Sequence, residues 1–568
     1  MLSEKQPLRQ RRRSSFSILS IIAHVALSVA LFISIYTFWP SRHSPEPDQL
    51  HQLEEAPSLE RSTSFQLKHV FHHGTGKYNR VHKRLDVTPE FLERHENTLA
   101  ELTESLYAEN EPVDPNNADS VLRSEGWSRA LGDKDPWTMD LTIRPSSKPA
   151  RLRRLKERHT PHFLDSYLQY AMEVKGDPKK LDRIGLEWEP EQDVLLPDIQ
   201  DKDSVVALAL ISSNAYVKLP LDDDEKKKSD WIDVGDPWDV DEENPDVNFG
   251  WLDDGLRGHV FVSNDSKTVV IGIKGTSGAG LPGGGSDETS GNDKTNDNLL
   301  FSCCCARVGY MWTTVCDCYE KTYTCNQDCL EKELLRQDRY YQAALDLYRN
   351  VTKIYDPETT DIWVTGHSLG GALASLLGRT YGLPVVAFEA PGEMLATKRL
   401  HLPQAPGIPK HMEHIWHFGN TADPIFMGVC NGASSSCSVG GYAMETACHT
   451  GKLCVYDVVT DHGWHVSLLN HRIHTVIDEI ILKYNTTATC VDQPPCRDCF
   501  NWRFVSKDDL EPDEPKLPHP LKPKPKPTET SSSASTSTSS SLPSESDKPK
   551  KCLERTWYGW CKKWEGEE

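Results

Sequence analysis

The sequence predicts an α/β fold with a mostly parallel sheet, preceded by one transmembrane helix. Three observations lead to this prediction: an uncharged apolar stretch near the start of the chain, alternating strand and helix patterns from about residue 200, and a serine between two glycines where a strand meets a helix. Strands that alternate with helices favour a parallel sheet with helices packed on its faces.

The apolar stretch covers residues 16–39, FSILSIIAHVALSVALFISIYTFW, and contains no charged side chain. As a helix it would be about 36 Å long, which is enough to cross a bilayer. Four arginines lie within residues 9–13, so the positive-inside rule places the N-terminus in the cytosol and the rest of the chain across the membrane. A cleaved signal peptide usually has a shorter apolar core. We therefore expect the uncleaved anchor of a single-pass type II membrane protein.

The charge and the cysteines of the chain indicate a secretory lumen. The formal net charge is −21 at pH 7, and no basic face that would neutralise phosphates is visible, so nucleic acid is not an expected partner. All 16 cysteines lie at or after Cys303, and an even number of cysteines in a lumenal chain favours disulfides over zinc. Three Asn-x-Ser/Thr sequons are candidate glycosylation sites there: Asn264, Asn350 and Asn485.

Changes in composition divide the chain into five parts. Residues 1–15 are the cytosolic N-terminus, residues 16–39 the anchor, and residues 40–195 a polar lumenal region without assignable chemistry. Residues 196–504 form the α/β domain. Residues 505–568 are a low-complexity lumenal tail, rich in Pro, Lys, Ser and Thr, that cannot bury a core.

Apolar periodicity predicts the order of elements within the α/β domain. The predicted helices cover residues 205–217, 332–355, the stretch after residue 368, and 470–484. The predicted strands are a pair around a polar turn over 258–275, then 362–364, 383–392, 414–420 and 454–459.

The strand at 362–364 leads into the motif that carries the chemistry. Residues 361–378 read DIWVTGHSLGGALASLLG and place Ser368 between two glycines. Such a G-x-S-x-G turn raises the serine Oγ above the sheet of an α/β-hydrolase fold, and its glycines let strand and helix approach closely. The bare pattern arises by chance about 0.2 times in a chain of this length, but the flanking strand and helix make it specific. Ser368 is the predicted nucleophile, and the alternative is a structural glycine-rich turn.

A serine nucleophile needs a base, and the base needs an acid that fixes its tautomer. In this fold the acid and then the base follow the serine along the chain. Asp423 lies in the turn after the predicted strand 414–420 and is the predicted acid. Asp361 precedes the nucleophile strand and Asp457 lies within a later one, so both fit worse.

The predicted base lies between the last strand and the last helix. That loop contains His462, His465, His471 and His474. Asn470 is a plausible cap of the last helix, which would put His471 at the first helical position. His471 is therefore favoured, with His465 as the main alternative.

The tetrahedral oxyanion needs backbone N–H donors. One is predicted from Leu369, directly after the nucleophile, and the other from Thr276, in the loop that ends the strand VVIGIKG. The glycine-rich segment after Thr276 lacks the Lys-Ser/Thr ending of a phosphate-binding loop. Residues 277–330, rich in Gly and Cys, predict a disulfide-stapled flap over the acyl pocket.

These motifs resemble a known family. GHSLGGALASL, IGIKGTSG and NTADP resemble the class 3 lipases, and the longer run to FEAPGE, together with HLPQAPGIP, HVFHHGTG and the anchor, is similar to the fungal autophagy-related lipases. The resemblance covers the anchor and roughly residues 60–500. It implies Ser368, Asp423 and His471 as the triad, hydrolysis of triacylglycerol and phospholipid esters, and traffic through the endoplasmic reticulum, Golgi and multivesicular bodies to the vacuole, where autophagic bodies are broken down.

Together the residues predict acyl transfer, in which Ser368 attacks an ester carbonyl and water later releases the fatty acid. The mechanism requires no metal and no cofactor, and the expected partners are the lipid bilayer and its ester lipids. A triad does not distinguish esters from amides, so a serine peptidase or acyltransferase on the same scaffold stays open. A non-catalytic membrane-tethering protein is the alternative from another class.

The histidines predict a pH effect on membrane binding. Protonation of all 22 histidines would shift the formal charge from −21 to −21 + 22 = +1. We therefore expect tighter binding to anionic liposomes near pH 5 than at pH 7.

Overall fold

The computed structural model describes residues 62–75, 82–108, 135–147, 149–190, 192–217, 230–235, 255–276, 290–307, 314–407, 413–432, 435–506, 552–555 and 561–564. All of them belong to the unit Leu59–Glu568. The predicted anchor over residues 16–39 lies outside these ranges, as does most of the predicted tail. Within the described ranges, none of the helices has the length and apolar composition that a membrane span requires.

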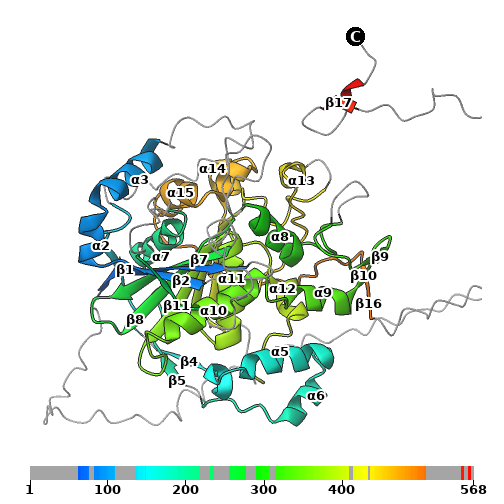
Figure 1. Cartoon of the computed structure of the whole chain (residues 1–568), viewed down its shortest axis with the longest axis horizontal. Helices are drawn as coiled ribbons and strands as arrows, with labels where there is room; N and C mark the ends of the chain where they lie inside the picture. The colour runs from blue at the N-terminus through cyan, green and yellow to red at the C-terminus, as the bar shows by residue number, and fades with distance from the viewer. Residues whose placement is uncertain are drawn as a thin grey trace, which may run out of the picture. The chain divides into compact units, whose positions relative to one another are not determined.

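The strands of the described chain form an eleven-stranded central sheet (Figure 1), in the order β15-β14-β13-β12-β11-β8-β7-β1-β2-β6, with β3 paired to β1. The strands are β1 (Thr63–Gly74), β2 (His82–Asp86), β3 (Leu141–Ile143), β6 (Trp231–Asp233), β7 (Gly255–Ser263), β8 (Thr268–Ile273), β11 (Asp361–His367), β12 (Val385–Phe388), β13 (Ile415–Asn420), β14 (Lys452–Tyr456) and β15 (Cys490–Asp492). Strands β8, β11, β12, β13 and β14 pair in parallel. The other pairs in this sheet are antiparallel, so the sheet is parallel only in the region around the nucleophile strand.

Strand β1 extends the sheet from an unexpected part of the chain. It belongs to the polar region 40–195, yet it pairs with β7 over a register that runs from Phe65 opposite Ser263 to Gly74 opposite Gly255. The second half of β1, Val70–Gly74, is buried throughout. The boundary predicted at residue 195 therefore does not separate β1 and β2 from the sheet of the α/β domain.

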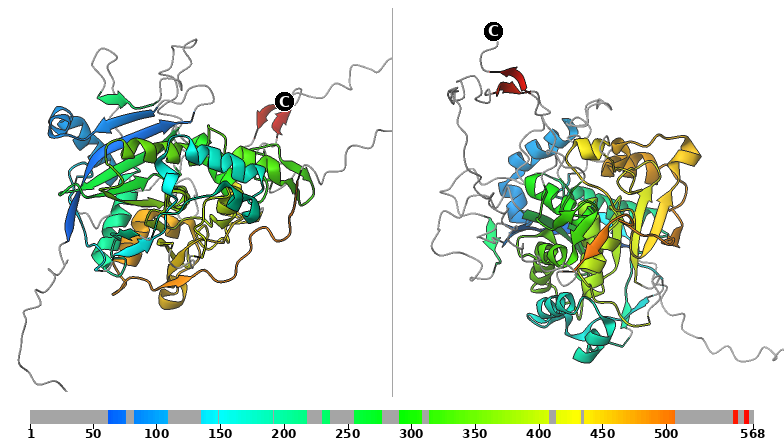
Figure 2. Two further views of the ribbon diagram at one scale, coloured as in Figure 1. Left: turned by 90° about the horizontal axis from the view of Figure 1, so that it is seen from below. Right: turned by 90° about the vertical axis from the view of Figure 1, so that its right-hand side faces the viewer.

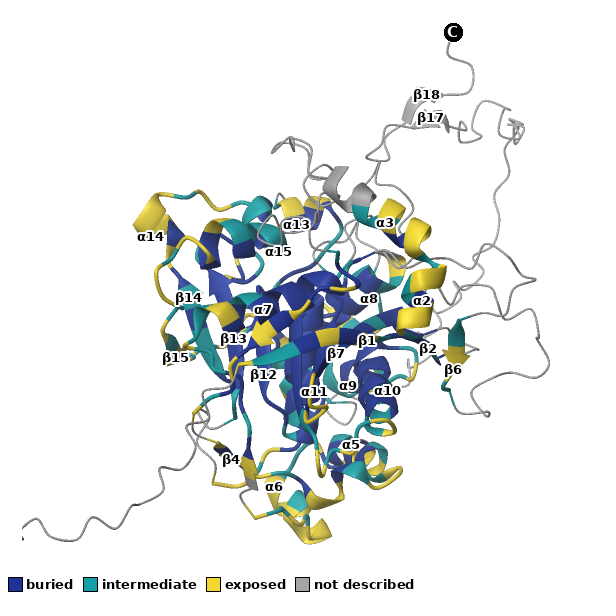
Figure 3. Ribbon diagram, turned by 90° about the vertical axis from the view of Figure 1, so that its left-hand side faces the viewer, coloured by how far each residue is buried: buried dark blue, intermediate teal, exposed yellow. Residues whose placement is uncertain are grey.

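Helices cover the sheet, and two apolar clusters fill the space between. One cluster joins the sheet to α10 (Tyr340–Thr352) and α11 (Leu369–Tyr381). The other joins it to α7 (Lys202–Asn214), α15 (Ile473–Thr475) and the π-helical turn Val476–Ile481. Figure 3 shows α10 and α11 in the buried colour, whereas α2, α3 and α14 carry exposed residues. Helices on the sheet faces are the arrangement that alternating strands and helices predict.

The remaining helices and strands are short or peripheral. The helices are α2 (Pro89–Arg94), α3 (Glu96–Ala108), α5 (Phe163–Glu173), α6 (Pro178–Leu181), α8 (Ser290–Phe301), α9 (Gln327–Leu334), α12 (Met394–Arg399), α13 (Ser436–Val439), α14 (Val458–His462) and the 3-10 turns Lys156–His159, Asp182–Ile184 and Leu468–His471. The strands outside the central sheet are β4 (Ala150–Leu152), β5 (Gln192–Val194), β9 (Tyr319–Lys321), β10 (Thr324–Asn326), β16 (Arg503–Val505), β17 (Cys552–Arg555) and β18 (Cys561–Trp564).

Seven disulfides confirm the preference for sulfur–sulfur bonds over zinc in the described chain. They join Cys303–Cys499, Cys304–Cys325, Cys305–Cys316, Cys318–Cys329, Cys430–Cys437, Cys448–Cys496 and Cys454–Cys490. Three of them fasten the C-terminal strap, residues 490–505, which runs from β15 at the edge of the central sheet to β16 beside β10. Figure 2 shows this strap in orange along the outside of the fold.

The disulfides also correct the extent of the predicted flap over residues 277–330. Helix α8 contributes Leu299, Leu300 and Phe301 to the main core, and Cys303 is bonded to Cys499 in the strap. The described residues 290–307 and 314–330 are therefore fastened to the body, because core packing and disulfides hold them there. Residues 277–289 of the predicted flap lie outside the described ranges.

Candidate active site

The nucleophile turn has the strained geometry that its glycines predict. Ser368 lies between β11 and α11 with φ 57° and ψ −130°, a backbone region that residues other than glycine rarely adopt. A Cβ on Gly370 would lie 2.2 Å from the carbonyl oxygen of Ile273, and one on Gly366 would lie 2.5 Å from the backbone of Gly370. Only glycine fits at either position, because strand and helix meet backbone to backbone.

The three predicted triad residues are brought together at this turn. The Ser368 Oγ lies 2.8 Å from His471 Nε2, and His471 Nδ1 lies 2.7 Å from Asp423 Oδ2. The carboxylate can only accept, so Nδ1–H donates to Asp423 and the lone pair of Nε2 accepts the serine proton. Ser368 is 7% exposed, His471 4% and Asp423 0%. Asp361 and Asp457, the acids that fitted worse, lie elsewhere: Asp361 accepts from the backbone of Leu195, and Asp457 caps α14.

A second buried carboxyl group, on Glu389, lies behind the acid. Burial, followed by the charge of Asp423, raises the pKa of Glu389 well above its usual range, so Glu389 is protonated and donates a hydrogen bond to Asp423. Burial also opposes ionisation of Asp423, but the charge of His471 and the hydrogen bonds from His471 and Glu389 outweigh it and lower the pKa of Asp423. The pair therefore carries one negative charge, on the carboxylate that faces the base.

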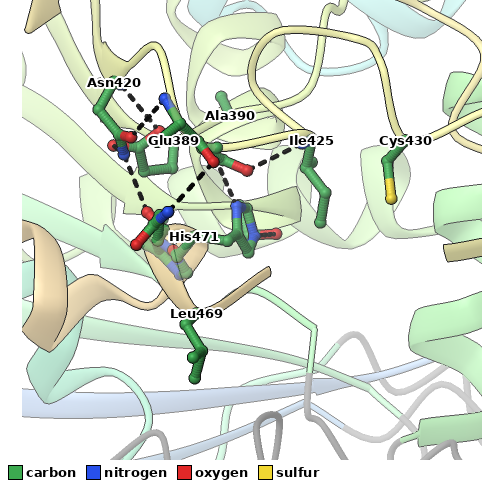
Figure 4. A network of polar contacts seen from close by, with 12 residues as sticks. Glu389, Ala390, Asn420, Ile425, Cys430, Leu469 and His471 are labelled. Atoms are coloured by element: carbon green, nitrogen blue, oxygen red, sulfur yellow. Dashed lines mark hydrogen bonds and ion pairs between the residues drawn. The ribbon is translucent and has the colours of Figure 1, made fainter. Parts of the chain in front are cut away.

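Asn420 links this acid pair to the backbone of the base (Figure 4). Its Nδ2 lies 2.9 Å from Glu389 Oε1 and 2.9 Å from the carbonyl oxygen of Asn470, the residue before His471. Its backbone N–H donates to Glu389 Oε2 at 3.2 Å. One side chain at the end of β13 thus fixes the relative positions of acid and base.

The loop before the last helix presents only one of its four histidines to the serine. His462 and His465 are exposed, and His474 lies one turn beyond His471. The prediction that Asn470 caps the last helix is wrong. Arg472 precedes α15, and His471 is the last residue of the 3-10 turn Leu468–His471. The reason is that the Nδ2 of Asn470 donates to the carbonyl of His465 at 2.8 Å and so closes the loop instead of capping a helix.

His367, the variable residue directly before the nucleophile in the G-x-S-x-G motif, contacts the backbone of the base. Its Nε2 lies 2.7 Å from the carbonyl oxygen of His471, and its Nδ1 lies 2.8 Å from the hydroxyl of Tyr216. Burial, with a contribution from the charge of His471, lowers the pKa of His367 to about 3. The ring is therefore neutral, with Nε2–H donating to His471 and Nδ1 accepting from Tyr216.

The predicted oxyanion loop lies directly against the nucleophile. A Cβ on Gly275 would lie 2.3 Å from the carbonyl oxygen of His367 and 3.2 Å from the Ser368 Cβ. Leu369 is the first residue of α11, where backbone N–H groups have no partner within the helix. Thr276 is held by its hydroxyl, which donates to Asp297 Oδ2 at 2.5 Å. The two predicted donors therefore come from the segments that flank Ser368.

Comparison with known proteins identifies the family. A family model described as "Lipase (class 3)" matches residues 299–381, a range that includes Ser368. Relatives named "Putative lipase ATG15" match more of the chain. The relative from Meyerozyma guilliermondii is 63% identical over 100% of this chain and 99% of its own length. The relative from Candida albicans is 63% identical over 92% of this chain and 91% of its own length. The relative from Saccharomyces cerevisiae is 52% identical over 79% of this chain and 81% of its own length.

The chain belongs to the ATG15 family. The resemblance read from the motifs is thereby confirmed, and the chain is a lipase-type hydrolase of the α/β-hydrolase fold. Solved lipases match weakly. Lip2 lipase from Yarrowia lipolytica is 17% identical over 39% of this chain and 65% of that chain with a TM-score of 0.18, and the Rhizomucor miehei triacylglyceride lipase is 14% identical over 42% and 68% with a TM-score of 0.19. Scores this low carry no argument about the fold.

Helix α8 supplies site residues of this ATG15 family member that the sequence analysis missed. Asp297 holds Thr276, and the Asp293 carboxylate lies 3.8 Å from the Nζ of Lys274. Burial raises the pKa of Asp297 to about 8, although the hydrogen bond from Thr276 works against it. The spacing of the two aspartates by four residues is the only sequence signal, and it resembles that of any solvated helix face.

The three predicted glycosylation sites differ in accessibility. Asn264, in the turn between β7 and β8, and Asn485, after the last helix, are exposed. Asn350 is only 5% exposed, and its Nδ2, the atom that would carry the glycan, lies 2.9 Å from His73 Nε2. The folded chain leaves no room for a glycan on Asn350, because α10 packs this face against β1.

Proposed function

We propose that the chain is a membrane-anchored serine lipase that hydrolyses phospholipid and triacylglycerol esters and breaks down the membranes of autophagic bodies and multivesicular-body vesicles in the vacuole lumen. The contact of 2.8 Å between Ser368 and His471 carries the catalytic part of the proposal. Membership of the ATG15 family supports the lipase part. The compartment rests on the motif resemblance and on the apolar stretch over residues 16–39.

In the proposed mechanism, the Ser368 Oγ attacks the ester carbonyl carbon while its proton moves to His471 Nε2. The Asp423 carboxylate stabilises the imidazolium that forms, and the backbone N–H groups of Leu369 and Thr276 stabilise the oxyanion. When the intermediate collapses, His471 gives the proton to the leaving alcohol oxygen. Water then attacks the acyl-serine with His471 again as base, which releases the fatty acid and restores the serine hydroxyl.

Exposed apolar side chains on the loops that carry Asp423 and His471 favour a lipid surface over a soluble substrate. Met427 and Val429 follow Asp423 and are 39% and 55% exposed, and Val466 precedes His471 and is 56% exposed. Both loops adjoin a triad residue, so an apolar phase that contacts these side chains would bring ester bonds to the serine.

The catalytic proposal is tested with the full-length chain and its Ser368→Ala variant in detergent micelles. We expect the wild-type chain to release fatty acid from phospholipid vesicles and triacylglycerol emulsions, and the variant to be at least about 10⁴-fold slower. A fluorophosphonate probe should label residue 368. Cleavage of a peptide amide in preference to the lipids would indicate a peptidase, and vesicle binding by both proteins without fatty-acid release would indicate a tether.

The lipid-surface proposal is tested by Val429→Asp and Val466→Asp, with Val491→Asp as the matched control. Val491 is 53% exposed but lies in β15 at the edge of the sheet. We expect the first two variants to lose hydrolysis of vesicle lipids while they keep hydrolysis of a soluble short-chain ester. Equal losses in all three variants, or loss of both activities, would contradict a docking role for these loops.

The proposed localisation is a single-pass type II membrane protein that travels from the endoplasmic reticulum through the Golgi to the multivesicular-body membrane and reaches the vacuole. Peptide mapping of the protein purified from its native host should find glycans on Asn264 and Asn485 and none on Asn350. The opposite result would be that Asn264 and Asn485 carry no glycan and that protease added to intact vesicles digests the triad domain. That result would place the domain in the cytosol.

A further inference from the structure

A second cluster of buried titratable side chains lies outside the catalytic network. Glu393 is the N-cap residue of α12, His417 lies in β13, and His449 lies in the segment before β14. Their exposed fractions are 0%, 0% and 2%. One ligand atom from each side chain lies within 4.8 Å of the other two. Two imidazoles and one carboxylate therefore face each other away from solvent.

Among the described residues, four polar atoms of this cluster lack a partner in good hydrogen-bond geometry. They are Glu393 Oε2, Nδ1 and Nε2 of His417, and Nδ1 of His449. His417 Nε2 lies 3.3 Å from Glu393 Oε1, within ion-pair distance, but the contact lacks hydrogen-bond geometry. Native proteins leave few buried polar atoms without a partner. Four such atoms in one place indicate that a binding partner belongs between them.

The surrounding residues orient the cluster for such a partner. The Ser375 hydroxyl donates to Glu393 Oε1 at 3.0 Å, and Thr450 donates to the same oxygen through its backbone N–H and its hydroxyl, so Oε2 stays available. His449 Nε2 lies 2.9 Å from the carbonyl oxygen of Ala390. In the neutral ring the proton therefore sits on Nε2 and Nδ1 keeps its lone pair. Metal-binding histidines are commonly held in this way by a carbonyl group.

We propose that Glu393, His417 and His449 bind a divalent transition-metal ion, most suitably zinc. Two imidazoles and one carboxylate suit zinc, whereas Mg²⁺ and Ca²⁺ prefer oxygen ligands alone. Zinc–ligand bonds of about 2.0–2.2 Å hold tetrahedral ligand atoms roughly 3.3–3.5 Å apart. The ligand atoms of Glu393, His417 and His449 lie within 4.8 Å of one another, so small side-chain shifts bring them to this separation.

The position of the cluster gives the ion a structural role. It joins the start of α12, the middle of β13 and the segment that leads into β14. Glu389 follows β12 directly, and Asp423 follows β13 after two residues. The ion therefore holds β13, the strand that leads to Asp423, against the start of α12 and the segment before β14, and it touches none of the reacting atoms.

The test measures zinc in the full-length chain after loading with zinc chloride and dialysis against metal-free buffer. We expect about one zinc ion per chain in the wild-type protein and in Ser368→Ala, and a loss of this zinc in Glu393→Gln and in His449→Gln. His401→Gln is the matched control, because His401 forms a similar part-buried contact of 3.2 Å with Glu331. It should keep the ion.

A variant that unfolds would also lose zinc, so the wild-type chain is measured by a second method. Zinc should raise its apparent unfolding temperature, and dipicolinate should lower it, by more than about 3 °C. A wild-type chain without bound zinc and without a chelator effect would overturn the proposal and leave a buried histidine–carboxylate contact. Zinc that persists in both cluster variants would overturn it too, as an adventitious ion only. Neither result bears on the proposed hydrolysis, which Ser368→Ala tests separately.

Discussion

At the scale of single residues, the acid of the triad is a pair of carboxyl groups that share one proton. Asp423 faces His471, and the protonated Glu389 lies behind it and is held by Asn420. A negative charge on Glu389 would be repelled by the charge of Asp423, because the site excludes water. The pair thus keeps the negative charge where it stabilises the imidazolium.

This arrangement predicts different effects for two amide substitutions. Glu389→Gln keeps a donor toward Asp423 and loses one acceptor for Asn420, so we expect kcat/KM to fall by about tenfold or less and stability by about 1 kcal/mol. Asp423→Asn puts the wrong tautomer on His471 and should lower kcat by about 10⁴-fold. The measurement is ester hydrolysis at pH 7 with purified, folded variants. Equal losses in the two variants would mean that Glu389 is ionised.

Spacing and turn chemistry predicted Ser368, Asp423 and His471, but they could not predict Glu389, Asp297 or His367. The first three follow from a motif, a chain order and a turn. The others act because burial shifts their protonation, and a sequence does not show which titratable groups become buried. The expected cap at Asn470 failed for a similar reason, since its amide has a tertiary partner in the carbonyl of His465.

At the scale of elements, the approach of α11 to β8 makes a glycine indispensable. A Cβ on Gly370 would meet the carbonyl oxygen of Ile273 at 2.2 Å, and backbone cannot move aside as a side chain can. We expect Gly370→Ala to lower the free energy of unfolding by more than about 3 kcal/mol and to disturb the Thr276 loop. The measurement is urea unfolding together with hydrolysis of a soluble ester.

The control is a glycine in another helix. At Gly291 in α8, no atom of the described residues lies within 4 Å of the position that a Cβ would occupy. In that helix alanine should be neutral or stabilising by up to about 1 kcal/mol. A stable, active Gly370→Ala protein would show that the helix and the strand are farther apart than the structure places them.

The alternation of strands and helices was enough to predict β8, β11, β12, β13 and β14, since each repeats one pattern. It did not predict that β1 lies beside β7, because the two strands pair although they lie far apart in the sequence. The predicted strand over 454–459 ends early, since Asp457 caps a short helix and stops the pairing at Tyr456. Pairing between distant segments is information that local periodicity does not hold.

At the scale of the whole molecule, two classes of buried group respond to acid in opposite ways. His367 has its pKa lowered to about 3, chiefly by burial, so acid below pH 6.5 protonates the unfolded chain first and destabilises the fold. Asp297 has its pKa raised to about 8, chiefly by burial, so the folded chain binds that proton more tightly and acid stabilises the fold.

This opposition predicts two pH-dependent changes in stability. When the pH falls from 7 to 4.5, the wild-type chain should lose about 2 kcal/mol of unfolding free energy through His367. The His367→Gln variant has no ring to titrate there, so it should not show this loss. Relative to the wild-type chain, Asp297→Asn should lose a similar amount over the same interval. Urea unfolding at both pH values measures the two slopes. Slopes of the same sign would refute the assigned protonation states.

The same burial limits the expected effect of pH on membrane binding. His159, His259 and His367 have lowered pKa values, chiefly because they are buried. At least three of the 22 histidines therefore stay neutral near pH 5, and the formal charge does not reach the positive value that full protonation would give. Acid should strengthen liposome binding less than the sequence count implies.

The C-terminal strap has a consequence for the lifetime of the chain among peptidases. Its three cysteines, Cys490, Cys496 and Cys499, are bonded to Cys454, Cys448 and Cys303. A nick between Cys490 and Cys496 would leave both fragments joined by two of these bonds. We expect such a clipped chain to migrate as one band on a non-reducing gel, to separate into two after reduction, and to stay folded until then.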